Sequence, residues 1–407
     1  MARNGNSAEE APSVIISIDF GTTFTKVAYV LLLADVKKQQ HVIHSIEEWP
    51  GAMGEETSKG CPSMVKYEED GSMKWGCEID RYTEGRIEAL KSLLDPTSKP
   101  PTYSSDMDSG DLRAKLGKPA VDIVSDFLRA VSEHALKSIA SEYPEEFMEG
   151  LEKEFILTVP CGWPKEAKKS FLKAVVNTDI SPVVLIPEPE AASIQAMNEL
   201  DRKDWDAKAP FIICDAGGGT VHLVTCGVIE AEVEALVKAT GGNFGSLMLN
   251  RKFHEHIEHA VGEQNWLKVL EAGALSHVIK MFDDQVKSKF PLMHGGDGDE
   301  ILVCFPQAKL EDDLDKGLER SCLSVSRESL QGIFDSVVDE IDKLVKEQLE
   351  TMKFTRLQEL REGNGMWNEI GKVKTVILTG GFGNSDYLLQ QLQLKNPRLS
   401  VVRVPEP

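Results

Sequence analysis

The 407-residue chain carries 66 acidic and 45 basic side chains, giving a net charge of −21, and 41% of its residues are hydrophobic. That hydrophobic fraction is typical of a folded globular protein, and the length allows two to four structural units with cores of their own. The negative charge argues against nucleic acid or an anionic membrane as the main partner, because both attract basic surfaces.

The chain begins with a polar stretch and then a predicted hairpin. Residues 1–13 have no apolar segment of the kind found in secretory signals, and we expect a disordered lead-in. From Val14 to about Leu33, an apolar strand ends at Asp19, a short turn contains Gly21, and a β-branched strand follows. Glycine permits the close approach of another molecule, and an aspartate beside such a turn can hold Mg²⁺ through water.

A single lysine stands out in the next region. Residues 87–94 predict a short helix in which Lys91 is the one lysine among apolar neighbours, and a solvated helix lysine is the alternative interpretation. Asp95–Pro119 is rich in Pro, Ser, Asp and Gly and predicts a loop. An amphipathic helix over Val121–Ala140 and a buried strand over Phe155–Pro160 follow.

Strand and helix then alternate. A helix is predicted from Pro164 to about Val176, because proline is favoured in the first helical turn. The strand Val183–Ile186 leads directly into a helix that begins near Pro187 and contains Glu188 and Glu190. Acidic residues suit a helix N-terminus, so both glutamates could serve only as caps. Strand followed by helix, twice over, indicates α/β architecture.

Phe211–Val228 is the clearest motif in the chain. Four apolar residues lead into Asp215, three glycines follow at Gly217–Gly219, and a β-branched strand returns. Consecutive backbone N–H groups in such a turn can form a nest for phosphate, whereas the alternative is an ordinary hairpin tip. The plan repeats the first hairpin, with Asp215 in the place of Asp19. This repeat indicates a duplicated domain in which each copy could contact phosphate.

Helices, turns and a last strand complete the chain. In order, the sequence predicts a glycine turn at Gly241–Gly245 that opens a helix, helical structure over 266–290, an acidic turn at Gly295–Glu300, a long helix over Ser326–Arg361, the strand Val376–Thr379, a glycine turn, and a helix over Asp386–Gln393. The last turn joins a strand to a capped helix N-terminus, which can accept an anion or the polar edge of a nucleotide.

Seven cysteines are scattered along the chain without a CxxC pair. An odd number without metal-type spacing predicts reduced thiols, as in a cytoplasmic or nuclear protein.

Five short motifs occur in a fixed order. They are Asp19-Phe20-Gly21-Thr22-Thr23, Leu157-Thr158-Val159-Pro160, Pro187-Glu188-Pro189-Glu190-Ala191-Ala192, Asp215-Ala216-Gly217-Gly218-Gly219-Thr220 and Thr379-Gly380-Gly381. The set resembles the superfamily of actin, sugar kinases and seventy-kilodalton heat-shock proteins, and most closely its heat-shock branch. The resemblance extends from Val14 to Val404.

This resemblance implies an α/β, two-lobed, actin-like ATPase fold with duplicated ribonuclease-H-like domains around a nucleotide cleft. Lobe I would span 14–186 with an inserted subdomain at about 45–120, and lobe II would span 187–407 with an inserted subdomain at about 243–368. The implied ligands are ATP or ADP with Mg²⁺.

The resemblance also implies roles for individual residues. Asp19 and Asp215 would hold Mg²⁺ through waters. Lys91 would face the γ-phosphate and the attacking water, and Glu188 would orient that water. The catalytic set is Lys91, Glu188, Asp215 and Thr220. Phosphate contacts would come from Gly21, Thr22, Thr23, Phe24, Gly217, Gly218, Gly219, Thr220, Gly241 and Gly242. Lys287, Gly380, Gly381 and Phe382 would border the adenosine.

Three features depart from the family pattern. His222 stands where the family has a second aspartate, Asn243 replaces a glutamate, and the sequence stops at Pro407, before the usual closing helix and any peptide-binding domain. We therefore expect a slowly hydrolysing, heat-shock-like ATP-binding protein whose nucleotide state controls cleft closure and whose role is chaperone-related. A sugar-type kinase and a non-hydrolysing nucleotide sensor are the alternatives.

Overall fold

The chain divides into two compact units, Met1–Ala191 and Ala192–Pro407. The structure, a computed structural model, describes residues 12–33, 42–52, 60–80, 83, 85–95, 117–200, 209–229, 232–287, 290, 300–363 and 371–404. Most of the predicted lead-in, of the 95–119 loop and of the 295–300 turn lies outside these ranges.

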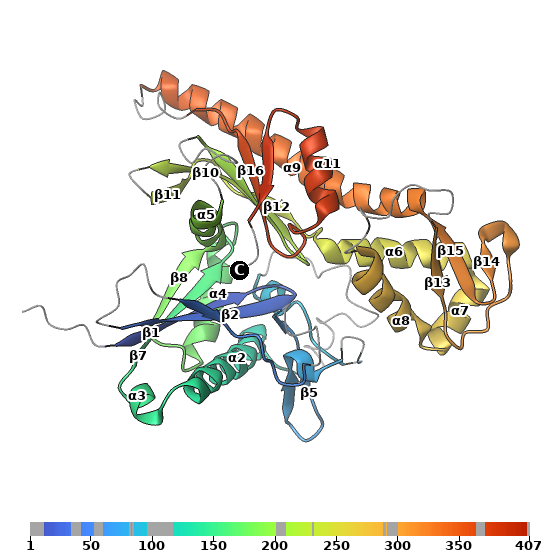
Figure 1. Cartoon of the computed structure of the whole chain (residues 1–407), viewed down its shortest axis with the longest axis horizontal. Helices are drawn as coiled ribbons and strands as arrows, with labels where there is room; N and C mark the ends of the chain where they lie inside the picture. Colours follow the sequence, from blue (N-terminus) through green and yellow to red (C-terminus); the bar gives the residue numbers. More distant parts are fainter. Residues whose placement is uncertain are drawn as a thin grey trace, which may run out of the picture. The chain divides into compact units, whose positions relative to one another are not determined.

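The first unit is built on a six-stranded mixed sheet with the order β3-β2-β1-β7-β8, and β4 pairs with β2 (Figure 1). β1 is antiparallel to β2 and parallel to β7, which is parallel to β8. The strands are β1 Ser13–Phe20, β2 Phe24–Leu32, β3 Ile43–Ser45, β4 Cys61–Pro62, β7 Glu152–Val159 and β8 Val183–Pro187; β5 Val65–Tyr67 and β6 Met73–Trp75 form a separate hairpin. The helices are the 3₁₀ segments η3 Gly76–Glu78 and η4 Leu90–Leu94, with α2 Ala120–Glu142, α3 Glu145–Glu149 and α4 Lys165–Val176. Helix α5, Glu188–Glu199, begins in this unit and continues into the second.

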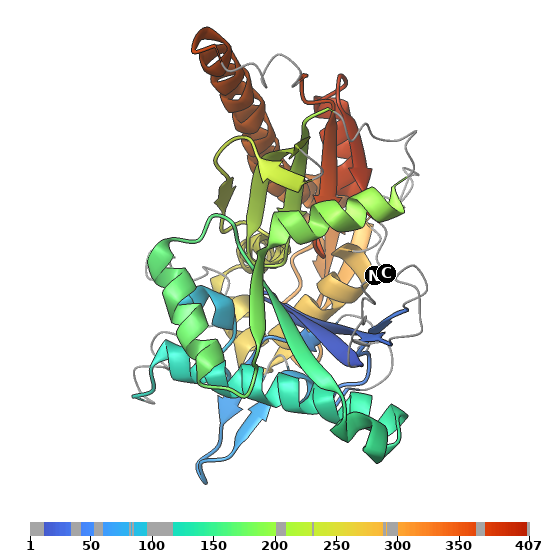
Figure 2. The same ribbon diagram turned by 90° about the vertical axis from the view of Figure 1, so that its left-hand side faces the viewer.

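Alternation along β1 decides which side chains reach the core of this unit. Val14, Ile16, Ile18 and Phe20 are buried, and the Phe20 ring lies 5.9 Å from Phe127 of α2 and 5.8 Å from Phe171 of α4. Helices α2 and α4 therefore pack on the face to which these side chains point (Figure 2). Because successive strand residues point to opposite faces, Asp19 lies on the other face.

The second unit contains a six-stranded sheet with the order β11-β10-β9-β16-β17, and β12 also pairs with β10. A three-stranded sheet, β13-β15-β14, lies elsewhere in the unit. The strands are β9 Phe211–Ala216, β10 Val221–Ile229, β11 Glu232–Ala235, β12 Thr240–Gly242, β13 Glu300–Cys304, β14 Leu318–Glu319, β15 Cys322–Ser326, β16 Thr375–Thr379 and β17 Ser400–Arg403. The helices are α6 Ser246–Val261, α7 Glu263–Glu271, α8 Ala274–Met281, the π-helix η5 Phe282–Lys287, η7 Leu314–Lys316, α9 Arg327–Arg361 and α11 Asp386–Lys395.

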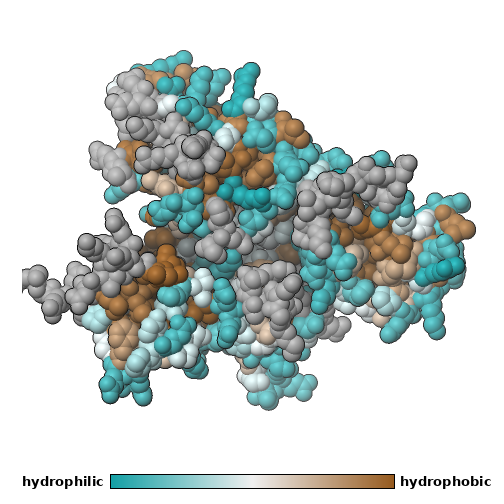
Figure 3. Space-filling view, viewed as in Figure 1, coloured by the Kyte–Doolittle hydropathy of each residue, from teal (hydrophilic) through white to brown (hydrophobic). Residues whose placement is uncertain are grey.

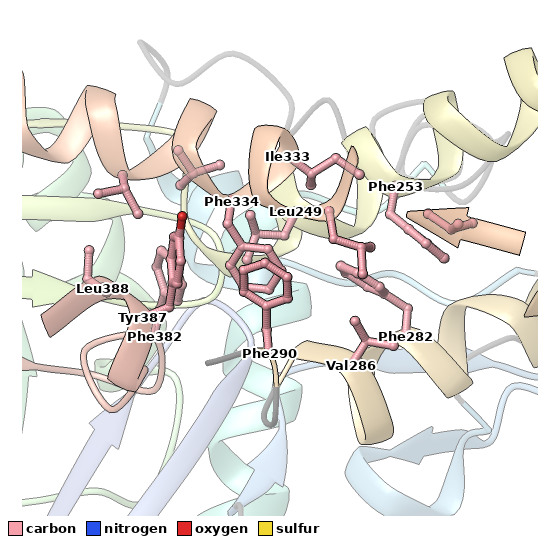
Figure 4. Packing of buried hydrophobic residues seen from close by; sticks show 14 of the residues in the cluster. Leu249, Phe253, Phe282, Val286, Phe290, Ile333, Phe334, Phe382, Tyr387 and Leu388 are labelled. Carbon is pink, nitrogen blue, oxygen red and sulfur yellow. The ribbon is translucent and has the colours of Figure 1, made fainter. Parts of the chain in front are cut away.

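Aromatic side chains fill the core of the second unit (Figure 4). Phe290 stacks on Phe334 of α9 with ring centroids 4.4 Å apart, and Tyr387 of α11 meets Phe334 edge-on at 5.4 Å. Phe253 of α6 stacks on Phe282 at 4.1 Å. The Phe282 and Phe334 rings, 6.4 Å apart, connect these pairs, so α6, η5, α9 and α11 share one core.

Both principal sheets begin with an antiparallel hairpin and continue with parallel strands, and each unit has its own hydrophobic core. This mixed α/β arrangement is consistent with a two-lobed actin-like ATPase fold. The predicted hairpins, the 121–140 helix, the long helix and the late strand are confirmed. The helical structure predicted over 266–290 is confirmed in the described residues, where it consists of α7, α8 and η5, with Gly273, at φ +63°, between α7 and α8.

The expectation that every thiol is reduced is also wrong. Cys304 of β13 and Cys322 of β15 form a disulfide. The two residues stand directly opposite each other in the antiparallel ladder, with their Cα atoms 4.0 Å apart. Cross-strand register brings them together, whereas a search for closely spaced cysteine pairs cannot detect it. The other five cysteines are outside the disulfide: Cys61, Cys77, Cys161, Cys214 and Cys226.

On the face drawn in Figure 3, hydrophilic residues predominate and smaller hydrophobic areas lie between them. Charged residues make up 27% of the chain, which accounts for this surface. Among the described segments, every helix is too short or too polar to cross a bilayer.

Candidate functional site

In the first unit, candidate residues gather at the carboxyl ends of parallel strands. Asp19 is the penultimate residue of β1, Thr158 is the penultimate residue of β7, and Glu188 directly follows β8. Thr158 Oγ1 donates a hydrogen bond of 2.6 Å to Asp19 Oδ1, which holds the exposed carboxylate in place. The carboxyl edge of parallel strands is where ligands bind in open α/β sheets.

The turn of the first hairpin is held from behind by one serine. Ser63, which is 2% exposed, donates its Oγ to Gly21 O at 2.8 Å and its N–H to Thr23 O at 2.9 Å. A Cβ atom at Gly21 would lie 2.2 Å from Phe24 O, so the turn requires glycine. The N–H groups of Thr22 and Thr23 donate to no acceptor in the described part of the chain. Anchored carbonyls and unpaired N–H groups are the features of an anion nest.

Lys91 and Glu188, far apart in the sequence, form a buried ion pair in this unit. Lys91 lies in η4 and is 7% exposed, and its Nζ also sits 5.9 Å from the centre of the Trp163 ring. Ala89, which precedes η4, has a left-handed φ of +54°, a strained conformation that is often found at functional sites. A buried ion pair contributes little net stability, since desolvation offsets the attraction.

The negative charge of Glu188 affects the pKa of the Cys161 thiol. The thiol lies in the loop between β7 and α4, and burial followed by the charge of Glu188 raises the pKa of Cys161 to about 11. A thiol with this pKa is almost wholly protonated at neutral pH and is a poor nucleophile. Glu188 therefore lies close enough to Cys161 for its charge to act on the thiol.

The glycine turn of the second unit is held from behind by the start of α6. Gly245 N, Ser246 N and Leu247 N donate to the carbonyls of Gly219, Gly217 and Gly218 at 3.2, 3.1 and 2.8 Å. A Cβ atom at Gly245 would lie 2.3 Å from Gly218 O, so glycine is required for this approach. The N–H groups of Gly218 and Gly219 donate to no described residue. The second turn thus has the same chemistry as the first.

Asp215 lies at the centre of a row of residues on adjacent strands. Thr379 of β16 is its parallel partner, and His222 of β10 is its antiparallel partner. Directly paired residues point to the same face, so the carboxylate and the imidazole are neighbours. A Cβ atom at Gly380, where φ is +79°, would lie only 2.5 Å from Asp215 Oδ1. Gly380 therefore leaves the space that the carboxylate needs.

Gly241 and Gly242 lie on β12, the strand next to His222 of β10. In the β10–β12 ladder, Gly241 pairs with His222 and Gly242 with Val221. A Cβ atom at Gly241 would lie 2.6 Å from His222 Nδ1, and one at Gly242 would lie 2.1 Å from the Phe244 ring. Both positions therefore depend on the absence of a side chain.

Two of the residues expected beside adenosine have other contacts. Lys287 Nζ forms an ion pair with Asp283 at 2.5 Å and a hydrogen bond with Asn250 Oδ1 at 2.9 Å. Phe382 is 4% exposed and its side chain lies in the aromatic core beside Tyr387 (Figure 4). Gly381, by contrast, is exposed and has no atom within 4 Å of an added Cβ.

No role was predicted for Thr158 or Ser63, although both contact predicted site residues. Thr158 lies inside a motif, and its position at the end of a buried strand was the available signal. Ser63 could not be found from the sequence, because its partner Gly21 lies far from it in the chain. In the described segments, no group of three His, Cys, Asp or Glu side chains is arranged to hold a metal.

Comparison with known proteins gives a consistent result. Heat shock 70 kDa protein 12A from Homo sapiens is 22% identical over 467 aligned residues, covering 95% of this chain and 66% of that protein. The Mus musculus protein of the same name gives the same values. The chain therefore spans about two thirds of the length of these relatives, and no protein-family model matches it. As the motifs predict, the chain is a distant relative of the seventy-kilodalton heat-shock proteins.

Proposed function

We propose that the chain binds Mg²⁺-ATP and Mg²⁺-ADP and hydrolyses ATP slowly. The observation that carries the proposal is that each unit has an Asp-x-Gly turn with anchored carbonyls and with N–H groups that donate to no residue in the described ranges. An N–H group buried away from water is costly unless a ligand accepts from it, and Gly219 of the second turn is buried. The distant heat-shock relatives support the same reading.

In this proposal the turns bind phosphate oxygens. Thr22 and Thr23 of the first turn, and Gly218 and Gly219 of the second, offer backbone N–H groups. Asp19 and Asp215 each contribute one carboxylate toward a water-coordinated Mg²⁺, an ion that proteins commonly hold through one or two carboxylates and substrate phosphates. The bound metal would neutralise charge on the phosphates during transfer. The residues at both turns fit these ligands in donor type and in charge.

The Lys91–Glu188 pair is proposed to act on water. The carboxylate of Glu188 accepts a hydrogen bond from the attacking water and orients it, while the Lys91 ammonium stabilises the charge that develops on the transferred phosphoryl group. Burial strengthens both effects, since the surroundings screen charge less than bulk water does. Asp215 and Thr220 complete the proposed catalytic set.

The adenosine side of the proposal rests on backbone. With the Phe382 side chain in the core, the exposed Gly380–Gly381 segment is the part of the late turn that can border a nucleoside. Lys287 contributes through the cluster that it forms with Asn250 and Asp283.

Two further points belong to the proposal. The shared strand order of the two principal sheets supports an origin by duplication. Nucleotide state is proposed to alter the arrangement of the two units, as in a heat-shock-like, chaperone-related ATPase. This point is tested by limited proteolysis of the α5 segment in three conditions: with ADP bound, with ATP bound and without nucleotide. Identical digestion patterns in all three would contradict it.

One experiment separates the proposed ATPase from the two alternatives. Phosphate release from ATP is measured with pure protein, alone and with a panel of sugars. Slow release without sugar supports the ATPase. Release that depends on one sugar supports a kinase, and nucleotide binding without turnover supports a sensor.

A further inference from the structure

A buried glutamine on α9 joins three backbone segments of the second unit. Gln348 is fully buried, and its Oε1 accepts from Thr225 Oγ1 at 2.8 Å. Its Nε2 donates to Lys238 O at 3.0 Å and to Thr240 Oγ1 at 3.1 Å. A buried amide is tolerated only when it is well paired, so the network specifies one arrangement of α9, β10 and the start of β12.

The network lies at a break in the outer edge of the sheet. β10 pairs with β11 over Cys226–Ile229 and with β12 over Val221–Leu223, so its partner strand is interrupted between the two. Leu236 N still donates to Thr225 O at 2.8 Å. Lys238 O then turns to the side chain of Gln348. The helix thereby supplies the hydrogen bond that a continuous ladder would otherwise provide.

The segment held by Gln348 leads directly into the candidate site. Thr240, held by Gln348, is followed by Gly241, the partner of His222. Thr225 and Thr240 point toward α9, because both hydroxyl groups bond to Gln348. Helix α9 packs against β10 and β12 (Figure 1). His222 and Asp215 lie on the opposite face of the sheet, because side chains alternate. Gln348 therefore acts through backbone and cannot itself reach a ligand at Asp215.

We propose that Gln348 is a positioning residue that fixes Thr240–Gly242 beside the Asp215 turn and thereby sets the affinity for nucleotide phosphate. The positioning of Thr240–Gly242 is a structural claim, which we call the structural half. The effect on nucleotide affinity, the functional half, rests on the proposed function. A variant that loses the network should retain the sheet but release β12.

The test compares Gln348→Leu with Val345→Ala. Leucine keeps much of the volume and removes all three hydrogen bonds, leaving Lys238 O unpaired. Val345 is also fully buried on α9, and its truncation to alanine removes only apolar atoms from the core. This variant is therefore the control for lost stability. Both proteins are checked for the fold by circular dichroism and compared at temperatures equally far below their melting points.

Amide hydrogen exchange in nucleotide-free protein is the first readout. We expect exchange over 238–242 to rise about tenfold in Gln348→Leu and to stay unchanged in Val345→Ala, with β9 protected in both. Equal exchange in the two variants would overturn the structural half. This readout decides that half even if wild-type protein binds no nucleotide, which would instead defeat the proposed function.

The dissociation constant of Mg²⁺-ADP is the second readout. We expect it to rise about tenfold in Gln348→Leu and less than twofold in Val345→Ala. Faster exchange over 238–242 with unchanged ADP affinity would overturn the functional half of the proposal.

Discussion

Adjacent glycines in the late turn provide a matched pair of substitutions. In Gly380→Ala, the new methyl group would lie 2.5 Å from Asp215 Oδ1 and 2.7 Å from Ala216 O, on a backbone with φ +79°. In Gly381→Ala, it would meet nothing within 4 Å. The two variants add the same atom one residue apart and differ in what that atom meets and in the left-handed backbone that only Gly380 adopts.

The expected cost of Gly380→Ala has two parts. The left-handed backbone costs about 1–2 kcal/mol for a residue with a Cβ atom. Ala216 O must also move, although it accepts hydrogen bonds from Phe382 N at 2.8 Å and Gly383 N at 3.0 Å, and weakening one of these costs about 1 kcal/mol. The sum of about 2–3 kcal/mol corresponds to a fall in Tm of about 4–12 °C for a unit of this size.

Urea denaturation and Mg²⁺-ADP titration of both variants provide the assay. Gly381→Ala should change the free energy of unfolding by less than about 0.5 kcal/mol and leave ADP affinity unaltered. Gly380→Ala should also weaken Mg²⁺-ADP binding, because the Asp215 carboxylate is displaced. Equal stability and equal ADP affinity in the two variants would refute the close approach of Gly380 to Asp215.

Three further predictions concern the ion pair and its surroundings. Lys91→Ala and Glu188→Gln should change nucleotide affinity by no more than about tenfold, equivalent to about 1.4 kcal/mol. Both should slow phosphate release far more, since the two groups are assigned to the attacking water and to transition-state charge. Parallel losses of affinity and rate would contradict these roles. His222→Asp should raise the rate of phosphate release severalfold by adding a carboxylate beside the proposed metal site, and an unchanged rate would show that the histidine does not limit turnover. The rate of alkylation of Cys161 by iodoacetamide should increase with pH toward the thiol pKa of about 11. Glu188→Gln should lower that pKa and speed the reaction at pH 8, because a negative charge that disfavours the thiolate is removed. Identical rates in both proteins would place Glu188 too far from the thiol.

Local pattern was sufficient to predict most of the elements. The two hairpins and the long helix have strong signals, because β-branched runs, glycine turns and a continuous apolar stripe each favour one structure. The helical structure expected over 266–290 is present, but the break between α7 and α8 was not predicted, because the apolar spacing continues through Gly273 and a single glycine in a helical pattern does not by itself end a helix. The short helix expected over 87–94 is a 3₁₀ turn over Leu90–Leu94, preceded by a left-handed alanine that no propensity would suggest.

The site was predictable only where residues lie in motifs. Asp19, Asp215 and the glycine turns could be found from the sequence, and the structure adds that their carbonyls are anchored. Lys91 and Glu188 were singled out by resemblance, and the structure brings them into contact.

Contacts between distant segments were not predictable. Ser63 meets Gly21, Gln348 meets Lys238, and Cys304 pairs with Cys322. Each of these contacts depends on tertiary packing or strand register, which one sequence does not encode in any local pattern.

Calorimetric titration with Mg²⁺-ADP tests the central claim most directly, using wild-type protein, Gly218→Val and Gly332→Val. Gly218 lies in the turn proposed to contact phosphate, whereas Gly332 is on α9 with open space around it. Wild type and Gly332→Val should bind one ADP with equal affinity, and Gly218→Val should bind at least about tenfold more weakly, because a branched side chain stands where phosphate must approach. Undiminished binding by Gly218→Val, or no binding by wild type, would contradict the account.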